Sequence, residues 1–423
     1  MPAVTLPFLS RFNAASLIAL TTALLVTSLP AKALDLLTTE VLAEQDSPQE
    51  QFNLGWIYET GSEGVTQDYK KAFQWYQKAA VNGNADAQFN LGVMYHEGRG
   101  VAKNITKAMQ WYKKAADQGD KDAQYNLGIL YENGIGIAQD YQEALKWYLK
   151  AAQQGDLHAQ YKIGWFYESG HGVDPDMSKA IKWYLPAADK GNVDAQYTMA
   201  TLYDEGRGVP QDYNKALKWY LKAASQDYVD AYVNLGVLYY QGHGVEVDYA
   251  KAVQWFLKAA QEDNAIGQLN LGIMYENGLG VEQDFEMAAS WYKKAAVKGD
   301  GQAQYSLGML YDSGYGVEYD PRQAVAWYQK AADQGMAEAQ YNLAMSYYLG
   351  EGVPKDFKKA IKWYTQAADQ DYGKASYNLG TMYYNGDGVT QSYSEAKKWF
   401  ERACLAEDVD GCRIYIDLSS ADE

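Results

Sequence analysis

The chain has 423 residues, of which 48% are hydrophobic and 22% charged, and these proportions exclude a disordered polypeptide. It contains 38 glycines against only 9 prolines, a balance typical of helices separated by short, repeated turns. The formal net charge of −17 argues against nucleic acid and anionic lipid surfaces as partners, because both are bound through basic patches.

The first 33 residues form a separate segment. Arg11 precedes the apolar run AASLIALTTALLVTSLP, and Ala31 and Ala33 place small residues around a cleavage site. This pattern predicts a secretory signal peptide over residues 1–33, cleaved after about Ala33. No later segment is long and apolar enough to span a bilayer, so we expect a soluble periplasmic or secreted chain without membrane insertion. The mature chain would carry 35 basic and 54 acidic residues, a net charge of −19, which suits a partner with basic residues.

Residues 34–46, LDLLTTEVLAEQD, have the apolar spacing of a partial helix and are predicted to cap the element that follows them. Ser47, Pro48 and Glu50 then predict a helix start, as the N-cap, the first helical residue and the capping-box partner. We therefore place the beginning of the main folded region at Ser47.

A period of 36 residues governs the chain from this point on. Tryptophan recurs at positions 75, 111, 147, 183, 219, 255, 291, 327, 363 and 399 without a slip. The tyrosines from Tyr95 to Tyr383, a pair of glycines and an alanine follow the same period. Ten repeats result, over residues 47–407, and such periodicity is the signature of a repeat array.

Each repeat predicts two helices. In repeat 3, DAQYNLGILYENG has the apolar spacing of a first helix, GIGIAQ turns the chain, and EALKWYLKAA continues as a second helix. Asp140 is the predicted N-cap of that second helix, with Glu143 as its capping-box partner. A glycine recurs inside the first helix, at 55, 92, 128, 164, 236, 272, 308 and 380, with alanine at 200 and 344. Such a glycine costs about 1 kcal/mol relative to alanine, so its repetition predicts a second helix that approaches closely.

The repeated pattern AxAQYNLGxMYxxGxGVxxDYxKAxxWYxKAAxxG resembles the Sel-1-like repeat, a relative of the tetratricopeptide repeat, over essentially the whole mature chain. The resemblance implies an all-α fold, an α/α solenoid that winds as a right-handed superhelix with its concave face lined by the first helices. It also implies a non-catalytic scaffold that assembles protein complexes or binds extracellular and envelope partners. Bacterial members are often exported, in keeping with the predicted signal peptide.

The end of the chain is predicted to cap the array. DVDGCRIYIDL opens a further first helix without a partner helix, and we assign residues 408–423 to this cap. Cys404 and Cys412 are the only cysteines and occupy positions that face each other across the turn before it. We expect a disulfide between them in an exported protein, and their spacing also resembles a cysteine-rich secreted branch of the family. Two buried free thiols are the alternative.

No pattern in the sequence indicates a catalytic, cofactor-binding or metal-binding site. The four histidines, at positions 96, 158, 171 and 243, fall at three different repeat positions without the spacing of a ligand set. We therefore expect no cofactor, no bound metal and no enzymatic activity.

By resemblance to tetratricopeptide repeats, four positions of each first helix face the concave groove. One is the carboxylate that follows the recurring tyrosine in most repeats, and an aromatic residue and an asparagine lie seven and six residues before it. The predicted partner-binding residues in these rows are Tyr125, Tyr161, Tyr197, Asn90, Asn126, Glu132, Glu168 and Asp204. Asparagine can hydrogen-bond a peptide backbone through both ends of its amide, and the carboxylates would select basic residues. The alternative is that tyrosine and asparagine serve helix packing and capping, while the carboxylates form a solvated face.

The fourth groove position lies three residues before the carboxylate and holds Trp56 and Trp165, the two tryptophans outside the 36-residue series. Tryptophan is enriched at binding hot spots, so both are predicted anchors for a partner. Repeat 4 departs from the pattern elsewhere too, because Lys162 replaces the asparagine and Pro186 falls inside the second helix, which it should kink. Relaxed packing in a tolerant array is the alternative.

The sequence thus predicts an exported, non-catalytic scaffold that binds a protein or peptide through its groove. A periplasmic regulator of a membrane sensor is an alternative that uses the same surface. Glycan or cell-wall binding or processing is a second alternative, because stacked aromatic rings also suit sugars. Glycan hydrolysis would need two carboxylates flanking one pocket, whereas the carboxylates here form a distributed row.

Overall fold

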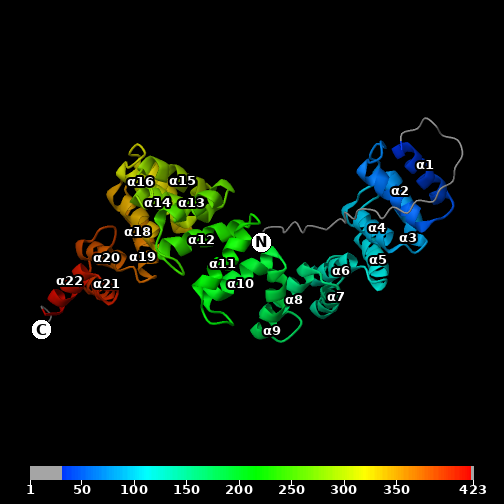
Figure 1. The fold of residues 1–423 in the computed structure, drawn as a ribbon. Coiled ribbons are helices and arrows are strands. Elements are labelled where there is room, and N and C mark those ends of the chain that lie inside the picture. Colours follow the sequence, from blue (N-terminus) through cyan, green and yellow to red (C-terminus); the bar gives the residue numbers. More distant parts are fainter. Residues whose placement is uncertain (1–30, 421–423) are drawn as a thin grey trace. The chain divides into compact units, whose positions relative to one another are not determined.

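The computed structural model describes residues 31–420, and this part of the chain consists of 22 α-helices with no strand. The chain divides into two compact units, Met1–Gln211 and Asp212–Glu423, with the division between the two helices of repeat 5. Figure 1 shows each unit as a succession of helix pairs, so the predicted all-α solenoid is confirmed. The predicted signal peptide lies outside the described residues, apart from residues 31–33.

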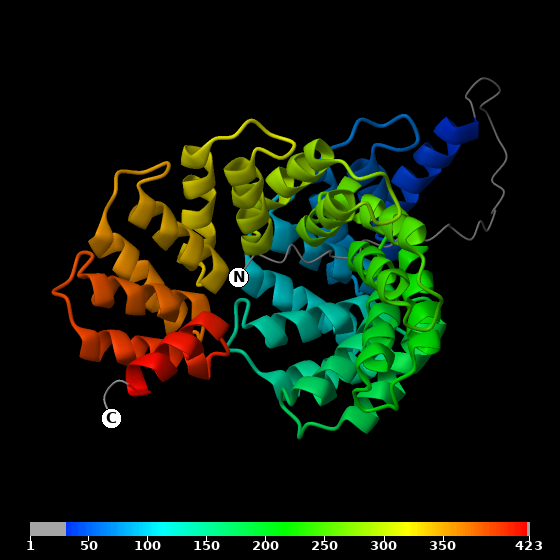
Figure 2. The ribbon, with the colours of Figure 1, turned by 90° about the vertical axis from the view of Figure 1, so that its left-hand side faces the viewer.

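Ten helix pairs correspond to the ten predicted repeats. The first helices are α2 (Pro48–Thr60), α4 (Ala85–Glu97), α6 (Lys121–Asn133), α8 (Leu157–Ser169), α10 (Val193–Glu205), α12 (Val229–Gln241), α14 (Ala265–Asn277), α16 (Gly301–Ser313), α18 (Ala337–Leu349) and α20 (Gly373–Asn385). The second helices are α3 (Tyr69–Val81), α5 (Ile105–Asp117), α7 (Tyr141–Gln153), α9 (Met177–Asp189), α11 (Tyr213–Ala224), α13 (Tyr249–Gln261), α15 (Phe285–Val297), α17 (Pro321–Asp333), α19 (Phe357–Ala368) and α21 (Tyr393–Leu405). The helix α1 (Ala31–Glu44) precedes the first pair and α22 (Val409–Ser420) follows the last. In Figure 2 the yellow to red helices of the second unit stand side by side in chain order.

The helices begin and end where the turn residues predict, but the capping box predicted at Ser47 and Glu50 is wrong: the Ser47 side chain makes no cap hydrogen bond, and Glu50 accepts from Asn53 at 2.9 Å. The side chain of Asp140 accepts a hydrogen bond from the Glu143 N–H and so starts α7, as expected for an N-cap. The Glu143 carboxylate, however, does not close a capping box, because the Asp140 N–H already bonds to the Tyr131 carbonyl at 2.9 Å. Glu143 accepts from Lys146 at 2.8 Å instead. Each first helix ends at a glycine in the left-handed conformation, such as Gly170 with φ 75°, whose N–H bonds to the carbonyl of Phe166.

The glycine inside the first helix faces an aromatic ring of the second helix in the same repeat. A Cβ added at Gly164 would lie 2.5 Å from two carbons of the Tyr184 ring, and one added at Gly128 would lie 2.4 Å from the Tyr148 ring. Both tyrosines are completely buried. The close helix approach predicted from the recurring glycine is therefore confirmed, and its cause is one buried ring in each repeat.

The tryptophans of the 36-residue series lie at the edge of this core. Trp147 is buried, whereas Trp183 is half-buried. Among the described residues, seven of these rings are covered by the lysine three positions on, as Lys150 covers Trp147 with its amine 3.7 Å from the ring centroid. Repeat 4 has Pro186 at the lysine position, and α9 continues through it as one helix. The proline thus replaces a lysine cover without interrupting the helix.

The helix α1 covers the outer side of the first repeat. Ala43 of α1 forms a buried cluster with Leu54 and Ile57 of α2. The amide of Gln51 in α2 also donates to the Ala43 carbonyl at 3.1 Å. The apolar surface that the first pair would otherwise expose is therefore covered.

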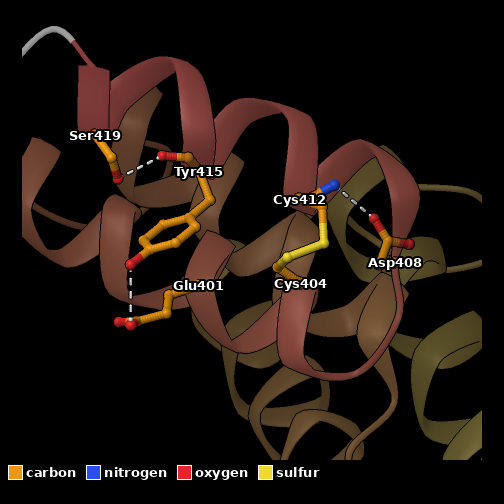
Figure 3. The surroundings of a disulfide bond; sticks show 7 residues. Glu401, Cys404, Asp408, Cys412, Tyr415 and Ser419 are labelled. Atoms are coloured by element: carbon orange, nitrogen blue, oxygen red, sulfur yellow. Dashed lines mark hydrogen bonds between the residues drawn. A yellow bond between two sulfur atoms is a disulfide. The ribbon is translucent and has the colours of Figure 1, made fainter.

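The helix α22 covers the last repeat and is tied to it twice, as Figure 3 shows. A disulfide joins Cys404 on α21 to Cys412 on α22, with the two Cα atoms 4.1 Å apart. Three residues from each cysteine, about one helical turn away, the Tyr415 hydroxyl donates to the Glu401 carboxylate at 3.1 Å. The final helix, which has a neighbouring pair on one side only, is therefore fixed to the array covalently.

We predict that Gly164→Ala destabilises the protein although alanine favours a helix by about 1 kcal/mol. The added methyl group needs space that the Tyr184 ring occupies, and overpacking of this kind costs about 1–3 kcal/mol. Thermal unfolding followed by circular dichroism should show a midpoint lowered by several degrees. Gly301→Ala is the matched control, because its Cβ would come no closer than 3.5 Å to Gln334. A Gly164→Ala midpoint equal to or above that of the control would contradict the packing argument.

We predict that Cys404→Ser combined with Cys412→Ser loosens α22 and leaves the other helices intact. Closing so short a loop is worth about 2–3 kcal/mol by the chain-entropy estimate. Hydrogen exchange should therefore speed up about tenfold or more in α22, with α20 unchanged as the internal control. Unchanged protection of α22 would show that the Tyr415 bond and helix packing suffice without the disulfide.

Candidate partner-binding face

The four predicted groove positions lie together on one side of the first helices, which we call the first-helix face. The ten predicted partner-binding residues all lie in the first unit, on α2, α4, α6, α8 and α10: Trp56, Asn90, Tyr125, Asn126, Glu132, Tyr161, Trp165, Glu168, Tyr197 and Asp204. Asn126 and Glu132 are buried, and the other eight are half-buried. Most of this face is therefore engaged in contacts within the chain while keeping some exposure.

The carboxylate row accepts hydrogen bonds from the buried tyrosines of the second helices. The Tyr184 hydroxyl donates to Glu168 Oε2 at 2.6 Å, and the Tyr148 hydroxyl donates to Glu132 in the same way. The same pairing joins Tyr76 to Glu59 in repeat 1 at 2.6 Å. A buried phenol needs an acceptor, so these carboxylates have a structural role that the sequence did not reveal.

The second oxygen of these carboxylates bonds to a cation of the following repeat. Glu168 Oε1 lies 2.7 Å from Arg207 Nη1, and Glu132 Oε1 lies 2.8 Å from Lys162 Nζ. In the first unit, Glu132 and Glu168 are thus neutralised within the chain and link neighbouring repeats. Their predicted role as selectors of basic residues would require a partner to displace these bonds.

The aromatic row packs against the same buried tyrosines. The ring centroids of Tyr125 and Tyr148 are 5.6 Å apart, and those of Tyr161 and Tyr184 are also 5.6 Å apart. Burial raises the pKa of Tyr125, and the negative charge of nearby Asp156 adds to this effect. The rings therefore serve helix packing, one of the two readings that the sequence left open, and present only part of their surface.

The asparagine row is directed at the phenol of the preceding repeat. Burial raises the pKa of Tyr76 well above its usual value, and a hydrogen bond from Asn90 opposes this rise. Asn126 lies close to the Tyr112 hydroxyl, but the Tyr112 oxygen and the Asn126 amide nitrogen are both buried without a hydrogen-bond partner in the described part of the chain. The asparagine therefore does not satisfy the buried phenol in every repeat, and the use of this row as grips on a peptide backbone remains a prediction.

Trp165 belongs to a compact group formed by the unusual residues of repeat 4. His171 stacks on its ring, with centroids 4.6 Å apart and planes 12° apart. The Lys162 amine lies 5.4 Å from the ring centroid while it pairs with Glu132. The side chains of Lys162, Trp165 and His171 therefore form one packed arrangement, and Trp165 exposes only the part of its ring that these neighbours leave uncovered.

We predict that the buried tyrosine–carboxylate bonds make the fold sensitive to alkaline pH. Burial, followed by the bond to Glu168, raises the pKa of Tyr184 above the value of about 10 expected for an unfolded chain. The stabilisation is therefore complete below about pH 10 and is lost above it, by about 1.4 kcal/mol per pH unit for each such tyrosine. Urea unfolding between pH 9 and 11 should show a shallower decline for Tyr184→Phe than for the wild type. Tyr319→Phe, at a 57% exposed ring, should keep the wild-type slope, and identical slopes for all three proteins would contradict the assignment.

In the second unit, the first-helix face contains a pocket. A pocket of about 220 Å³ lies among α18, α19 and α20. It is lined by Tyr341, Met345, Tyr348, Leu349, Tyr364, Tyr377, Asn378, Thr381 and Met382. Six of these nine residues occupy the four groove positions of repeats 9 and 10. These six belong to the predicted groove rows, but none was among the named partner-binding residues, and Leu349, Tyr364 and Met382 were not predicted at all. The signal in the sequence is Tyr348, which stands where most repeats have a carboxylate.

The described residues offer no metal centre, because no group of three or more His, Cys, Asp or Glu side chains among them is arranged to hold an ion. None of the helices in residues 31–420 has the length and apolar character needed to cross a membrane.

Comparison with known proteins places the chain among repeat proteins. The Sel1 repeat matches ten segments: 51–84, 85–120, 121–156, 157–192, 193–228, 229–264, 265–300, 301–336, 337–372 and 373–408. The structure is similar to that of c5321, a protective antigen present in uropathogenic Escherichia coli strains displaying an SLR fold, with 33% identity, coverage of 91% of this chain and 90% of that chain, and a TM-score of 0.68. It is also similar to a Sel1 repeat protein from Oxalobacter formigenes, with 35% identity, coverage of 73% and 90%, and a TM-score of 0.59. No curated protein matches the chain.

Helix pairs stacked with a fixed period, each closed by one buried tyrosine or phenylalanine, define an α/α repeat protein. The chain belongs to the Sel1 repeat family, as its repeated pattern predicts. Repeat proteins of this class are generally non-catalytic scaffolds for protein–protein interaction.

Proposed function

We propose that the protein is an exported, non-catalytic scaffold that binds another protein through its first-helix face. The observation that supports this best is that the residues which pack the helices recur from repeat to repeat, whereas residues on the first-helix face vary. The helical glycine and the second-helix tryptophan recur in nearly every repeat, whereas the Trp56 position is Trp, Val, Ile, Thr or Met in different repeats. Varied side chains on a regular scaffold are how repeat proteins form specific binding surfaces.

Charge favours a partner segment with basic residues. The mature chain has a net charge of −19 if residues 1–33 are removed. In the second unit, Glu276 and Asp312 on this face approach tyrosine hydroxyls, yet neither forms an ion pair with a cation in the described part of the chain. Carboxylates that lack an internal counter-ion attract a basic segment and speed its association.

Export is supported by two independent features. Residues 1–33 have the pattern of a secretory signal peptide, and the disulfide between Cys404 and Cys412 is of a kind that persists in oxidising compartments. We therefore assign the mature protein to the periplasm or the extracellular space. Regulation of a membrane sensor would use the same face and differ only in the identity of the partner.

The proposal is tested by capturing partners from an envelope extract with the mature chain and its variants. Trp56→Ala combined with Trp165→Ala should reduce capture of the wild-type partners about tenfold, since loss of a buried aromatic anchor at a protein interface typically costs more than 1 kcal/mol. Trp183→Ala is the matched control, because this half-buried tryptophan of repeat 4 belongs to the second helix. Circular dichroism verifies that all variants fold.

Equal capture by the wild type and the double variant would show that the tryptophans of this face do not anchor the partner. Hydrolysis of purified peptidoglycan by the recombinant chain would overturn the assignment as a non-enzyme. Retention of peptidoglycan in place of protein would replace the proposed partner class by a glycan.

A further inference from the structure

Repeat 9, like repeats 6 and 10, has a tyrosine at the first-helix position where most repeats have a carboxylate. Its residue at that position is Tyr348, whose hydroxyl donates to Asp387 of repeat 10 at 3.0 Å. The Tyr348 ring is also held beside Phe357, with centroids 5.3 Å apart. The Tyr348 side chain thus turns toward the next loop. In repeats 3 and 4 a glutamate lies beside the tyrosine equivalent to Tyr364, whereas in repeat 9 this space is part of the pocket.

The pocket combines apolar walls with a small polar region. Met345, Leu349 and Met382 contribute aliphatic surface. Tyr364 is 1% exposed, and Asn378 lies beside its hydroxyl. A volume of about 220 Å³ is enough for one large side chain but too small for a folded element. The shape and lining therefore fit a single apolar anchor residue.

The surroundings of the pocket are acidic. The first helices and loops of repeats 8 to 10 (301–320, 337–356 and 373–392) contain seven acidic residues and two basic ones. In the part of the chain that the structure describes, Asp312, Glu351 and Asp387 form no ion pair. Lys355, the nearest basic residue in this sequence segment, lies over the rings of Tyr348 and Phe357. The charge here is less compensated than in the first unit, where Glu168 is paired.

We propose that this pocket binds one large apolar side chain of an extended partner segment, and that lysine or arginine residues flanking it meet Asp312, Glu351 and Asp387. The inference rests on the proposed function and specifies the partner's chemistry. Burial of the apolar side chain supplies the affinity, because its surface leaves water. The flanking charges fix the orientation of the segment and accelerate its association.

The test measures binding of short fluorescent peptides to the full mature chain by anisotropy. The probe Lys-Lys-Leu-Lys-Lys should bind saturably and about tenfold or more tightly than the same peptide with glycine in place of leucine. A peptide with glutamate in place of lysine should bind more weakly than the probe. Higher ionic strength should weaken binding of the probe as the charges are screened.

Two variants close the pocket in different ways. Met345→Trp places in the pocket the residue that the chain itself carries at the same register in Trp56 and Trp165, so the fold should accept it. Tyr348→Glu restores the carboxylate found in repeats 3 and 4 and should bond to Tyr364. Each should weaken binding of the leucine peptide about tenfold. Leu257→Trp, on the second helix α13 with a 37% exposed side chain, is the control and should bind as the wild type does.

The inference is overturned if the wild type binds none of the peptides, if leucine gives no advantage over glycine, or if Met345→Trp binds as tightly as the wild type. Thermal unfolding separates these results from misfolding, because Tyr348→Glu should melt at or above the wild-type midpoint. Failure of the pocket inference is distinguishable from failure of the proposed function. If envelope partners still depend on Trp56 and Trp165 while the peptides ignore the pocket, only the pocket assignment is wrong.

Discussion

The contact between a helical glycine and a tyrosine ring is the constraint on which the rest of this structure depends. At Gly164 and Gly128 no side chain can project, so the second helix places a whole phenol ring against the backbone of the first. This contact sets the separation of the two helices in a pair and leaves the phenol fully buried. The tryptophan of the second helix then closes the edge of the pair, with a lysine amine over its ring.

Burial of that phenol determines much of the chemistry of the first-helix face. The hydroxyl group needs a partner in a place that water cannot reach. In repeats 1, 3 and 4 a carboxylate of the same repeat supplies it, as Glu59 does for Tyr76. The residues that look most like a binding site in the sequence therefore also stabilise the fold. The pocket beside Tyr364 lies where no carboxylate among the described residues accepts from the phenol.

The sequence was sufficient to predict what depends on period and local spacing. The ten helix pairs, the N-cap at Asp140 and the close approach at Gly164 all follow from residues a few positions apart or from the 36-residue count. The pairing of Glu168 with Arg207 does not, because it joins residues 39 positions apart on successive repeats. The pocket at repeat 9 depends on the direction in which Tyr348 turns, which is a choice among rotamers that the pattern of residue types cannot show.

The shared carboxylate has a consequence for how such an array can grow by duplication of its gene segments. Glu168 joins Tyr184 of its own repeat to Arg207 of the next one, so each linkage is encoded half in one repeat and half in its neighbour. At the junctions that carry this linkage, a copied repeat must therefore match its neighbour. A copy of repeat 10 inserted behind repeat 4 would bring the loop aspartate equivalent to Asp387 against Glu168, where two like charges repel. Duplications that survive should be those that preserve the order of donors and acceptors across each junction.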